Sequence, residues 1–498
     1  MRKIAAAIVS LSLVLALTSC HWEIPENVSV KSNADYNFSL GSFEKELDSG
    51  MNLTSMMGDT GKDNNDIQTF DYWPGKKDSR TQHFLLKVKV YEIGLDTLIP
   101  NLSTIIDTIP GGDDTEIDFS ENPLLSSMIS GFDVPVSTTG LDFNPSSMLS
   151  GMKDALGSDV AGLISFSDIP MYLYCETPGS IETNATLKMF YGSTTDPIVE
   201  RAGTSVDILT NSKLTNVPLP TLATETKTIP NKETGGETTS TFVITDLSKL
   251  PFIGKNDTNG NPDTNGNPDT KKKTSPIDIA ELINKPSDLI QEGDQLCIQY
   301  SLSGLGGKIT KAQAKAGLKI KLYAMIDLPL KFTVNDDVDI DLSSFMKKSE
   351  SSSESGNNAS NTTASNNTDS NSSESKEEDF AKYLKLVDSV SIKYIAYKLP
   401  IYPHTNKGLV LGIDFLGSGD FEYNPISVKE KTSSISESDK SVLTLKTETI
   451  QKLKDFSSFN PNFKLQIKKN STFSIPREKA VEMYVEANLK TDGTVQIN

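Results

Sequence analysis

Arginine is scarce in this sequence, and positive charge is outnumbered. Four of the 498 residues are arginine, and 66 acidic residues face 48 lysines and arginines, a formal charge of −18. The sequence pI is about 4.8. Nucleic-acid-binding proteins carry a basic patch or stripe, and arginine clusters recognise phosphate and carboxylate groups through paired hydrogen bonds. We therefore expect no nucleic-acid partner and no arginine-based phosphate site.

Histidine is almost absent as well. The three histidines are His21, His83 and His404, and no two of them have the i, i+4 spacing of a helical zinc site. No G-x-S-x-G nucleophile elbow occurs, and Gly417–Asp420 is not followed by the Gly-Lys-Ser/Thr of a phosphate loop. We expect no cofactor, no metal and no enzymatic activity. A hydrolase stays open as an alternative, because a Ser-His-Asp triad can be assembled from distant residues.

Aromatic residues make up 7% of the chain, with tryptophan only at Trp22 and Trp73, which is little for a sugar-stacking groove. Cysteine occurs three times. Cys175 and Cys297 both fall in candidate strands, so they could form a disulfide outside the cytoplasm or remain two buried free thiols. The sequence leaves both alternatives open.

No apolar run is long enough to span a bilayer, which takes about 20 residues. The longest, Ile4–Leu17, has 14 residues and follows the basic Met1–Lys3. This is typical of a secretory signal peptide. Thr18 and Ser19 fit a cleavage site, and Cys20 comes directly after them.

The sequence Leu17-Thr18-Ser19-Cys20 resembles the lipobox of bacterial lipoproteins. The resemblance implies a signal peptide over 1–19, acylation of Cys20 and a lipidated tether over 20–22. It also implies attachment to the cell membrane or outer membrane, outside the cytoplasm, through the N-terminal lipid. An ordinary secretory signal followed by a chance cysteine is the alternative.

Beyond the lipobox, the chain is loosely similar to large lipoproteins of spirochaete and Bacteroidetes type. The similarity lies in the β segments after the anchor, the sequence Asp-Ser-Val-Ser-Ile-Lys over 388–393 and the apolar segment 407–415. It implies no assigned function.

Period-two alternation of apolar residues dominates the rest of the chain and predicts strands with one buried face. The alternating segments are 36–40, 84–90, 171–175, 181–191, 318–326, 409–415 and 481–489. The turn residues Thr177–Ser180 predict a hairpin between the third and fourth of these. The predicted fold class is mainly β, with antiparallel, sandwich-like sheets and a few short helices.

Four segments have helical signals. Asn122-Pro123 and Asn144-Pro145 each place a capping residue and a proline before an apolar stripe, which predicts a helical insert over about 95–165. Ile277–Ile283 and Thr447–Phe456 are further short candidates.

Two segments are predicted to be disordered. Lys347–Asp379 is made almost entirely of Ser, Asn, Thr, Glu, Asp and Lys, and Gly254–Thr274 contains a directly repeated Thr-Asn-Gly-Asn-Pro-Asp. The latter resembles an EF-hand only superficially, because Pro262 stands where that loop needs glycine. Asp337, Asp339 and Asp341 would line one strand face, either as a calcium site or, as we favour, as a solvated sheet edge.

An internal correspondence suggests a duplication. Val30–Ser39 aligns without gaps on Val334–Ser343, and the predicted elements that follow keep a similar order in both halves. At about 150 residues per domain the length predicts two to four domains. We therefore predict two related tandem β-rich domains, over 23–326 and 327–498.

These features favour a membrane-anchored envelope protein with a non-enzymatic binding or structural role and an unidentified protein or lipid ligand. The alternative is a carrier of lipid or another hydrophobic ligand. Two β-rich domains, each with a helix against a long sheet, are similar to tubular lipid-binding folds, and the Met/Leu-rich segments near 122–164 could line an apolar tunnel.

Overall fold

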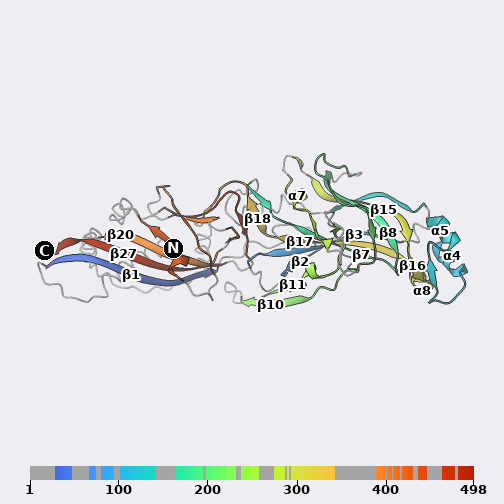
Figure 1. Cartoon of the computed structure of the whole chain (residues 1–498), viewed down its shortest axis with the longest axis horizontal. Helices are drawn as coiled ribbons and strands as arrows, with labels where there is room; N and C mark the ends of the chain where they lie inside the picture. The colour runs from blue at the N-terminus through green and yellow to red at the C-terminus, as the bar shows by residue number, and fades with distance from the viewer. Residues whose placement is uncertain are drawn as a thin grey trace, which may run out of the picture. The chain divides into compact units, whose positions relative to one another are not determined.

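The structure is a computed structural model. It describes residues 28–46, 67–74, 80–94, 101–129, 131–141, 163–193, 198–230, 237–256, 274–285, 289–290, 293–341, 387–399, 401–405, 408–414, 418–429, 436–445, 462–476 and 480–497. The chain forms two compact units (Figure 1). Unit 1 contains Met1–Gly50, Lys153–Ile164 and Thr333–Asn498, and unit 2 contains Met51–Met152 and Ser165–Phe332. Two of the four boundaries along the chain fall within β6 (Ile164–Phe166) and β18 (Lys331–Val334).

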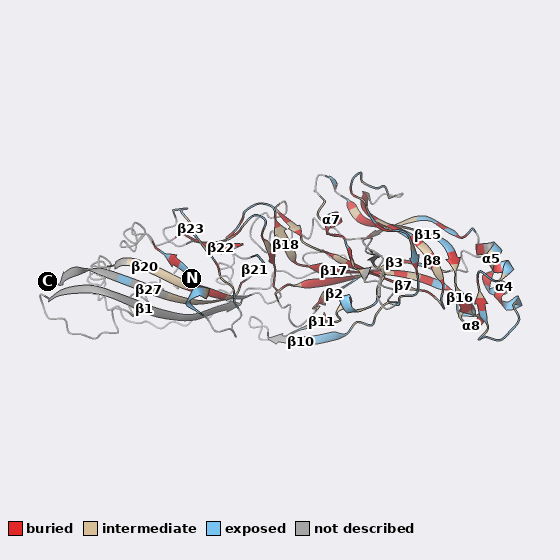
Figure 2. Ribbon diagram, in the orientation of Figure 1, coloured by how far each residue is buried: buried red, intermediate tan, exposed pale blue. Residues whose placement is uncertain are grey.

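A seven-stranded sheet forms the centre of unit 2. Its pairs are antiparallel except for β11 and β2, which are parallel. Alternating apolar residues of β3 and β17, including Leu86, Val88, Ile320 and Leu322, are buried as predicted, and Figure 2 shows the burial along β17. In spatial order the strands are β10 (Thr224–Pro230), β11 (Glu237–Val243), β2 (Ile67–Tyr72), β3 (His83–Gly94), β17 (Lys319–Pro329), β7 (Pro170–Glu176) and β14 (Ile277–Asp278).

A second, four-stranded sheet packs on the first. The ring of Tyr91 on β3 stacks on that of Tyr300 on β15, with centroids 4.6 Å apart. Two mainly antiparallel sheets in face-to-face contact form a sandwich, so the predicted fold class is confirmed. The strands of this sheet are β5 (Asp133–Leu141), β15 (Asp294–Gly306), β8 (Glu182–Ser193) and β9 (Val206–Leu214).

A tyrosine-rich cluster on the seven-stranded sheet is covered by the segment that follows β9. Tyr72, Tyr172 and Tyr174 are buried there with Leu85, Val243, Leu247 and Met325. Partly buried Leu219, Leu222, Leu250 and Phe252 pack against them. Short elements follow in the chain: the 3-10 turn η1 (Leu247–Lys249), the paired β12 (Lys255–Asn256) and β13 (Thr274–Ser275), and the helix α7 (Ala280–Ile283).

The predicted hairpin between 171–175 and 181–191 is wrong. Both segments are strands, but β7 pairs with β17 and β14, whereas β8 pairs with β15 and β9. The turn therefore carries the chain from one sheet to the other. Gly179 in this turn has φ +59°, and a Cβ atom there would lie 2.4 Å from the carbonyl oxygen of Lys308, so a side chain would be excluded.

Three short helices gather at one end of unit 2, next to the pair of β4 (Glu116–Asp118) and β16 (Lys308–Thr310) (Figure 1). They are α4 (Leu102–Thr108), α5 (Pro123–Ile129) and α8 (Lys311–Lys315). The Asn122 carboxamide accepts hydrogen bonds from the amides of Leu124 and Leu125, at 3.1 and 3.2 Å. The helix predicted after Asn122-Pro123 is confirmed. The short helix predicted over Ile277–Ile283 is confirmed only for Ala280–Ile283, because Ile277 and Asp278 pair with β7 as β14.

Unit 1 contains two further four-stranded sheets and the pair β21 (Tyr402–Pro403) and β26 (Thr472–Ser474). The first sheet has the order β1 (Val28–Glu46), β27 (Ala480–Ile497), β20 (Val387–Lys398) and β24 (Ser441–Thr444). The second has the order β19 (Val338–Asp341), β25 (Asn462–Ile467), β22 (Leu409–Asp414) and β23 (Glu422–Pro425). The 3-10 turn η3 (Glu437–Asp439) precedes β24.

The units divide the chain differently from the predicted domains 23–326 and 327–498. The boundary between Phe332 and Thr333 lies close to the predicted one, but β1 belongs to unit 1 because it pairs with β27 from Val28 to Glu46. The aligned segments also differ in local structure. Residues 30–39 lie within one strand, whereas 334–341 includes the break between β18 and β19.

Several predictions lie outside the described residues: the signal peptide and tether over 1–22, the helices over 144–162 and 447–456, the disordered segment 347–379 and most of the disordered segment 254–274. The ends of the latter are ordered, because Lys255–Asn256 pairs with Thr274–Ser275 as β12 and β13. In the part of the chain that is described, no helix is both long enough and apolar enough to cross a membrane.

Candidate functional site

The site residues predicted from the sequence are Cys20, Cys175 and Cys297. Cys20 lies outside the described residues. Cys175 and Cys297 are buried free thiols, so the possible disulfide is absent. Tyr300 contacts the other sheet through Tyr91, and Cys297, three residues earlier on the same strand, projects from the opposite face, away from the sheet that holds Cys175. Burial raises the pKa of the thiols to about 12 for Cys175 and about 11 for Cys297.

The structure places His83 and His404 in different units. His83 Nδ1 lies 2.8 Å from Asp327 Oδ1, and both residues are buried beside the ring of Tyr72. His404 Nε2 lies 2.9 Å from the hydroxyl of Ser474, which is fully buried. One histidine thus contacts a carboxylate and the other a serine. His83 is held in a packed interior at β3, whereas His404, just after β21, is exposed.

The predicted aspartate face lies on β19, an edge strand as favoured from the sequence. Asp337, just before β19, accepts the amide of Lys469 at 2.8 Å and lies 3.1 Å from Lys468 Nζ, and these partners lower the pKa of its carboxyl group. Asp339 accepts a hydrogen bond from the Gln466 amide at 2.8 Å. Among the residues that the structure describes, no three His, Cys, Asp or Glu side chains are placed to hold a metal ion.

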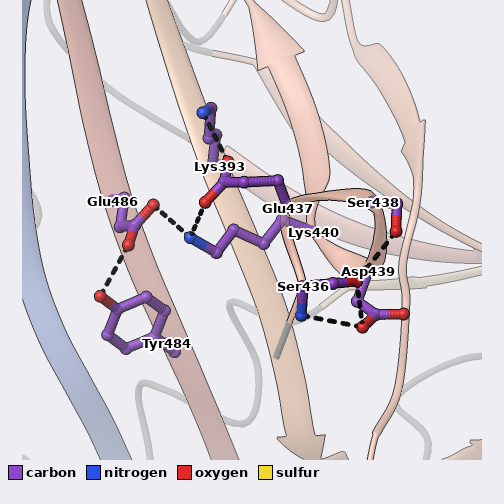
Figure 3. Close-up of polar contacts among 8 residues, drawn as sticks. All are labelled: Lys393, Ser436, Glu437, Ser438, Asp439, Lys440, Tyr484 and Glu486. Carbon is purple, nitrogen blue, oxygen red and sulfur yellow. Dashed lines mark hydrogen bonds and ion pairs between the residues drawn. The ribbon is translucent and has the colours of Figure 1, made fainter. Parts of the chain in front are cut away.

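A second set of acidic residues is held by lysines on unit 1 (Figure 3). We call Lys393, Glu437, Lys440, Tyr484 and Glu486 the Lys440 clasp. Lys440 Nζ lies 2.7 Å from Glu437 and 2.6 Å from Glu486, and Lys393 Nζ lies 2.8 Å from Glu437. The hydroxyl of Tyr484 donates to Glu486 at 2.7 Å. The clasp therefore ties the η3 turn to strands β20 and β27.

The electrostatics of the clasp are those of a closed network. Hydrogen bonds from Lys393 and Lys440 lower the pKa of Glu437 to about 2. Hydrogen bonds to Glu437 and Glu486 raise the pKa of Lys440, whose side chain is only 8% exposed. Each carboxylate already has a lysine partner. The clasp is thus suited to fixing the turn and offers little to a ligand.

The helical end of unit 2 contains a cavity of about 380 Å³. Strand β4 and the residues after it line most of it, with one residue each from the end of α4 and from β16. The lining residues are Ile109, Glu116, Ile117, Asp118, Glu121, Asn122 and Lys308. Three carboxylates and one ammonium group leave a formal lining charge of −2 (−3 + 1). We refer to it as the acidic cavity.

The carboxylates of the acidic cavity differ in their partners. Asp118 accepts hydrogen bonds from the amide and hydroxyl of Ser120, which lower the pKa of its carboxyl group, and it lies 3.6 Å from Lys308 Nζ. Glu116 and Glu121 are exposed, and within the described ranges their carboxylates have no hydrogen bond or ion pair. These two groups are the ones available to a ligand.

A buried lysine supports the wall of this cavity. Lys311, at the start of α8, donates hydrogen bonds to the carbonyl oxygens of Ile109 and Gly111, at 2.5 and 3.5 Å. It thereby binds carbonyl groups left open where α4 ends. Lys315 pairs with Asp113 at 2.8 Å. Both lysines are thus bonded to groups other than the carboxylates of Glu116 and Glu121.

This site was not among those predicted from the sequence, although the sequence contains a signal for it. Between Lys89 and Lys153 the chain has no lysine, arginine or histidine, yet it contains ten aspartates and glutamates. A segment of that length with only negatively charged side chains indicates a surface with a strong negative electrostatic potential.

No known protein guides the assignment of this site. No protein-family model matches the chain. Nor does any curated protein or solved structure.

Proposed function

We propose that this chain is a lipid-anchored protein of the bacterial cell envelope that binds a partner without catalysing a reaction. The observation that carries the proposal is the order of elements at the N-terminus. A basic start, a 14-residue apolar run, two small residues and Cys20 follow one another without interruption. Acyl chains on Cys20 would hold the protein at the membrane, since each buried methylene contributes about 0.8 kcal/mol and two or more chains give stable attachment.

The described residues support a binding role over a catalytic one. His83 is buried against Asp327, His404 contacts the Ser474 hydroxyl, and neither histidine lines the acidic cavity. The acidic cavity lies instead on a stable sandwich, among short helices and loops, where binding residues are commonly found. An anchored body with an open charged cavity at one end of a unit can hold a partner near the membrane.

The anchor is tested by metabolic labelling of the full chain with a palmitate analogue in a bacterial host. We expect label on the wild type and on a Cys175→Ala control, and none on Cys20→Ala. Cys20→Ala should also leave the membrane fraction, and proteinase treatment of intact cells would report surface exposure. Equal labelling of wild type and Cys20→Ala would overturn the anchor.

A further inference from the structure

We infer that the acidic cavity of unit 2 is an interaction surface for a protein segment that carries a lysine or arginine next to an apolar side chain. The inference rests on the binding role proposed above and names the partner's chemistry. It is supported by three observations: the carboxylates of Glu116 and Glu121 have no partner among the described residues, two isoleucines line the cavity, and the adjoining helix has an exposed leucine.

The charge of the cavity selects a cation. The formal lining charge is −2, and the only lining cation, Lys308, lies 3.6 Å from Asp118. Glu116 and Glu121 come from β4 and from the connection to α5, so an ammonium or guanidinium group could approach both. Charge complementarity of this kind steers encounter and selects partners.

The shape and the apolar walls favour a side chain over a metal ion. A cavity of about 380 Å³ is far larger than a single ion requires and falls in the range of small-ligand sites. Ile109 and Ile117 line it together with the carboxylates. Lysine and arginine bury an aliphatic stem against apolar surface while their charged end reaches polar groups.

An exposed apolar residue next to the cavity points to a protein segment as the occupant. Leu124, on α5, is 62% exposed and follows the lining residue Asn122 by two positions. The amides of Leu124 and Leu125 bond to the Asn122 side chain, which fixes this start of the helix. A peptide with an apolar side chain beside its basic residue would cover Leu124.

The test measures binding of a short fluorescein-labelled peptide that repeats lysine, leucine and glycine to the purified full chain in detergent. We expect saturable binding that weakens roughly fivefold in Glu116→Gln/Glu121→Gln, since each partly exposed ion pair contributes modestly. The matched control is Asp107→Asn/Asp114→Asn, which removes the same charge from exposed residues of the same end that do not line the cavity. Leu124→Ser should weaken binding about threefold.

Several outcomes would overturn the inference. These are the absence of saturable binding, equal affinity in the Glu116→Gln/Glu121→Gln variant, or an equal loss in the Asp107→Asn/Asp114→Asn control. Equal binding of a peptide with serine in place of leucine would also overturn it, because the site would then recognise a bare cation. Labelling of Cys20 is measured on the same preparation, so failure of the anchor and failure of this site are told apart.

Discussion

The Lys440 clasp and the acidic cavity contain the same kind of side chain and use it in opposite ways. In the clasp, Glu437 and Glu486 each contact a lysine within 2.8 Å. In the cavity, Glu116 and Glu121 have no such partner in the described part of the chain. Paired charges fix a turn on its sheet, whereas unpaired ones leave a field that a partner can neutralise. The state of pairing, more than the number of acids, separates a structural cluster from a binding surface.

The largest effect on stability is expected when the buried pair of His83 and Asp327 is broken. Like the carboxylates of the clasp, Asp327 already has a bonded partner. His83→Leu would leave the Asp327 carboxylate buried without its 2.8 Å partner. Breaking a buried pair on one side typically costs about 3–5 kcal/mol. We expect the free energy of unfolding of unit 2 in urea to fall by about 3 kcal/mol. The double variant His83→Leu/Asp327→Leu should recover part of this loss. A shift below about 1 kcal/mol would show that this pair does not hold the sheet.

A smaller loss is expected when the clasp is opened. Lys440→Met would remove the cation shared by Glu437 and Glu486 while keeping the length of the side chain. Because the lysine is buried but its partners are partly exposed, we expect the free energy of unfolding of unit 1 in urea to fall by about 1–2 kcal/mol.

The control for the clasp is Lys490→Met, which removes an exposed lysine from β27, the strand that contains Glu486. It should change stability by less than about 0.5 kcal/mol. Equal effects of the two substitutions would mean that the clasp contributes only net charge.

Local features of the fold could be predicted from the sequence, whereas contacts between distant segments could not. Strands such as β3 and β17 were predicted because alternation is local and depends only on which face is buried. Strand partners were not, since they depend on distant segments: β7 and β8 were assigned to one hairpin, and β1 was assigned to the wrong compact unit. The helix after Asn122 was predicted because its cap lies within four residues.

Neither the Lys440 clasp nor the acidic cavity could be predicted from the sequence, because each brings together residues that are distant in the chain. The clasp brings Lys393, the η3 turn and β27 together from positions up to 93 residues apart (486 − 393). The acidic cavity joins residues 109–122 to Lys308. Lysines elsewhere in the chain decide which carboxylates are paired, and composition alone cannot identify those lysines.

Acid should remove the contribution of the clasp to the stability of unit 1. The pKa of Glu437 is about 2 in the folded protein because Lys393 and Lys440 stabilise the carboxylate, against an ordinary value near 4.5. A carboxyl group with a lowered pKa stabilises the folded state above its unfolded pKa and loses that contribution as the pH falls. We expect the thermal midpoint of unit 1 to fall between about pH 5 and pH 2.

The matched variant for this pH dependence is Glu437→Gln, which cannot ionise. Its thermal midpoint should be lower at pH 6 and should depend less on pH than that of the wild type over the same interval. Circular dichroism melts at half-unit pH steps would measure both. Identical pH profiles would assign the acid sensitivity to other carboxylates, such as Asp439, whose pKa is lowered by Ser436 and Lys429.

The smallest effect on stability is expected at the acidic cavity, and this is what distinguishes it from the clasp. Glu116→Gln/Glu121→Gln removes two exposed carboxylates with no bonded partner among the described residues, so unfolding should change by less than about 0.5 kcal/mol. Any change should increase the free energy of unfolding, because two negative charges are removed from a segment rich in acidic residues. A loss above about 1 kcal/mol in urea unfolding would mean that these carboxylates are structural. An unchanged fold with weakened peptide binding would show that their charge is kept for a partner.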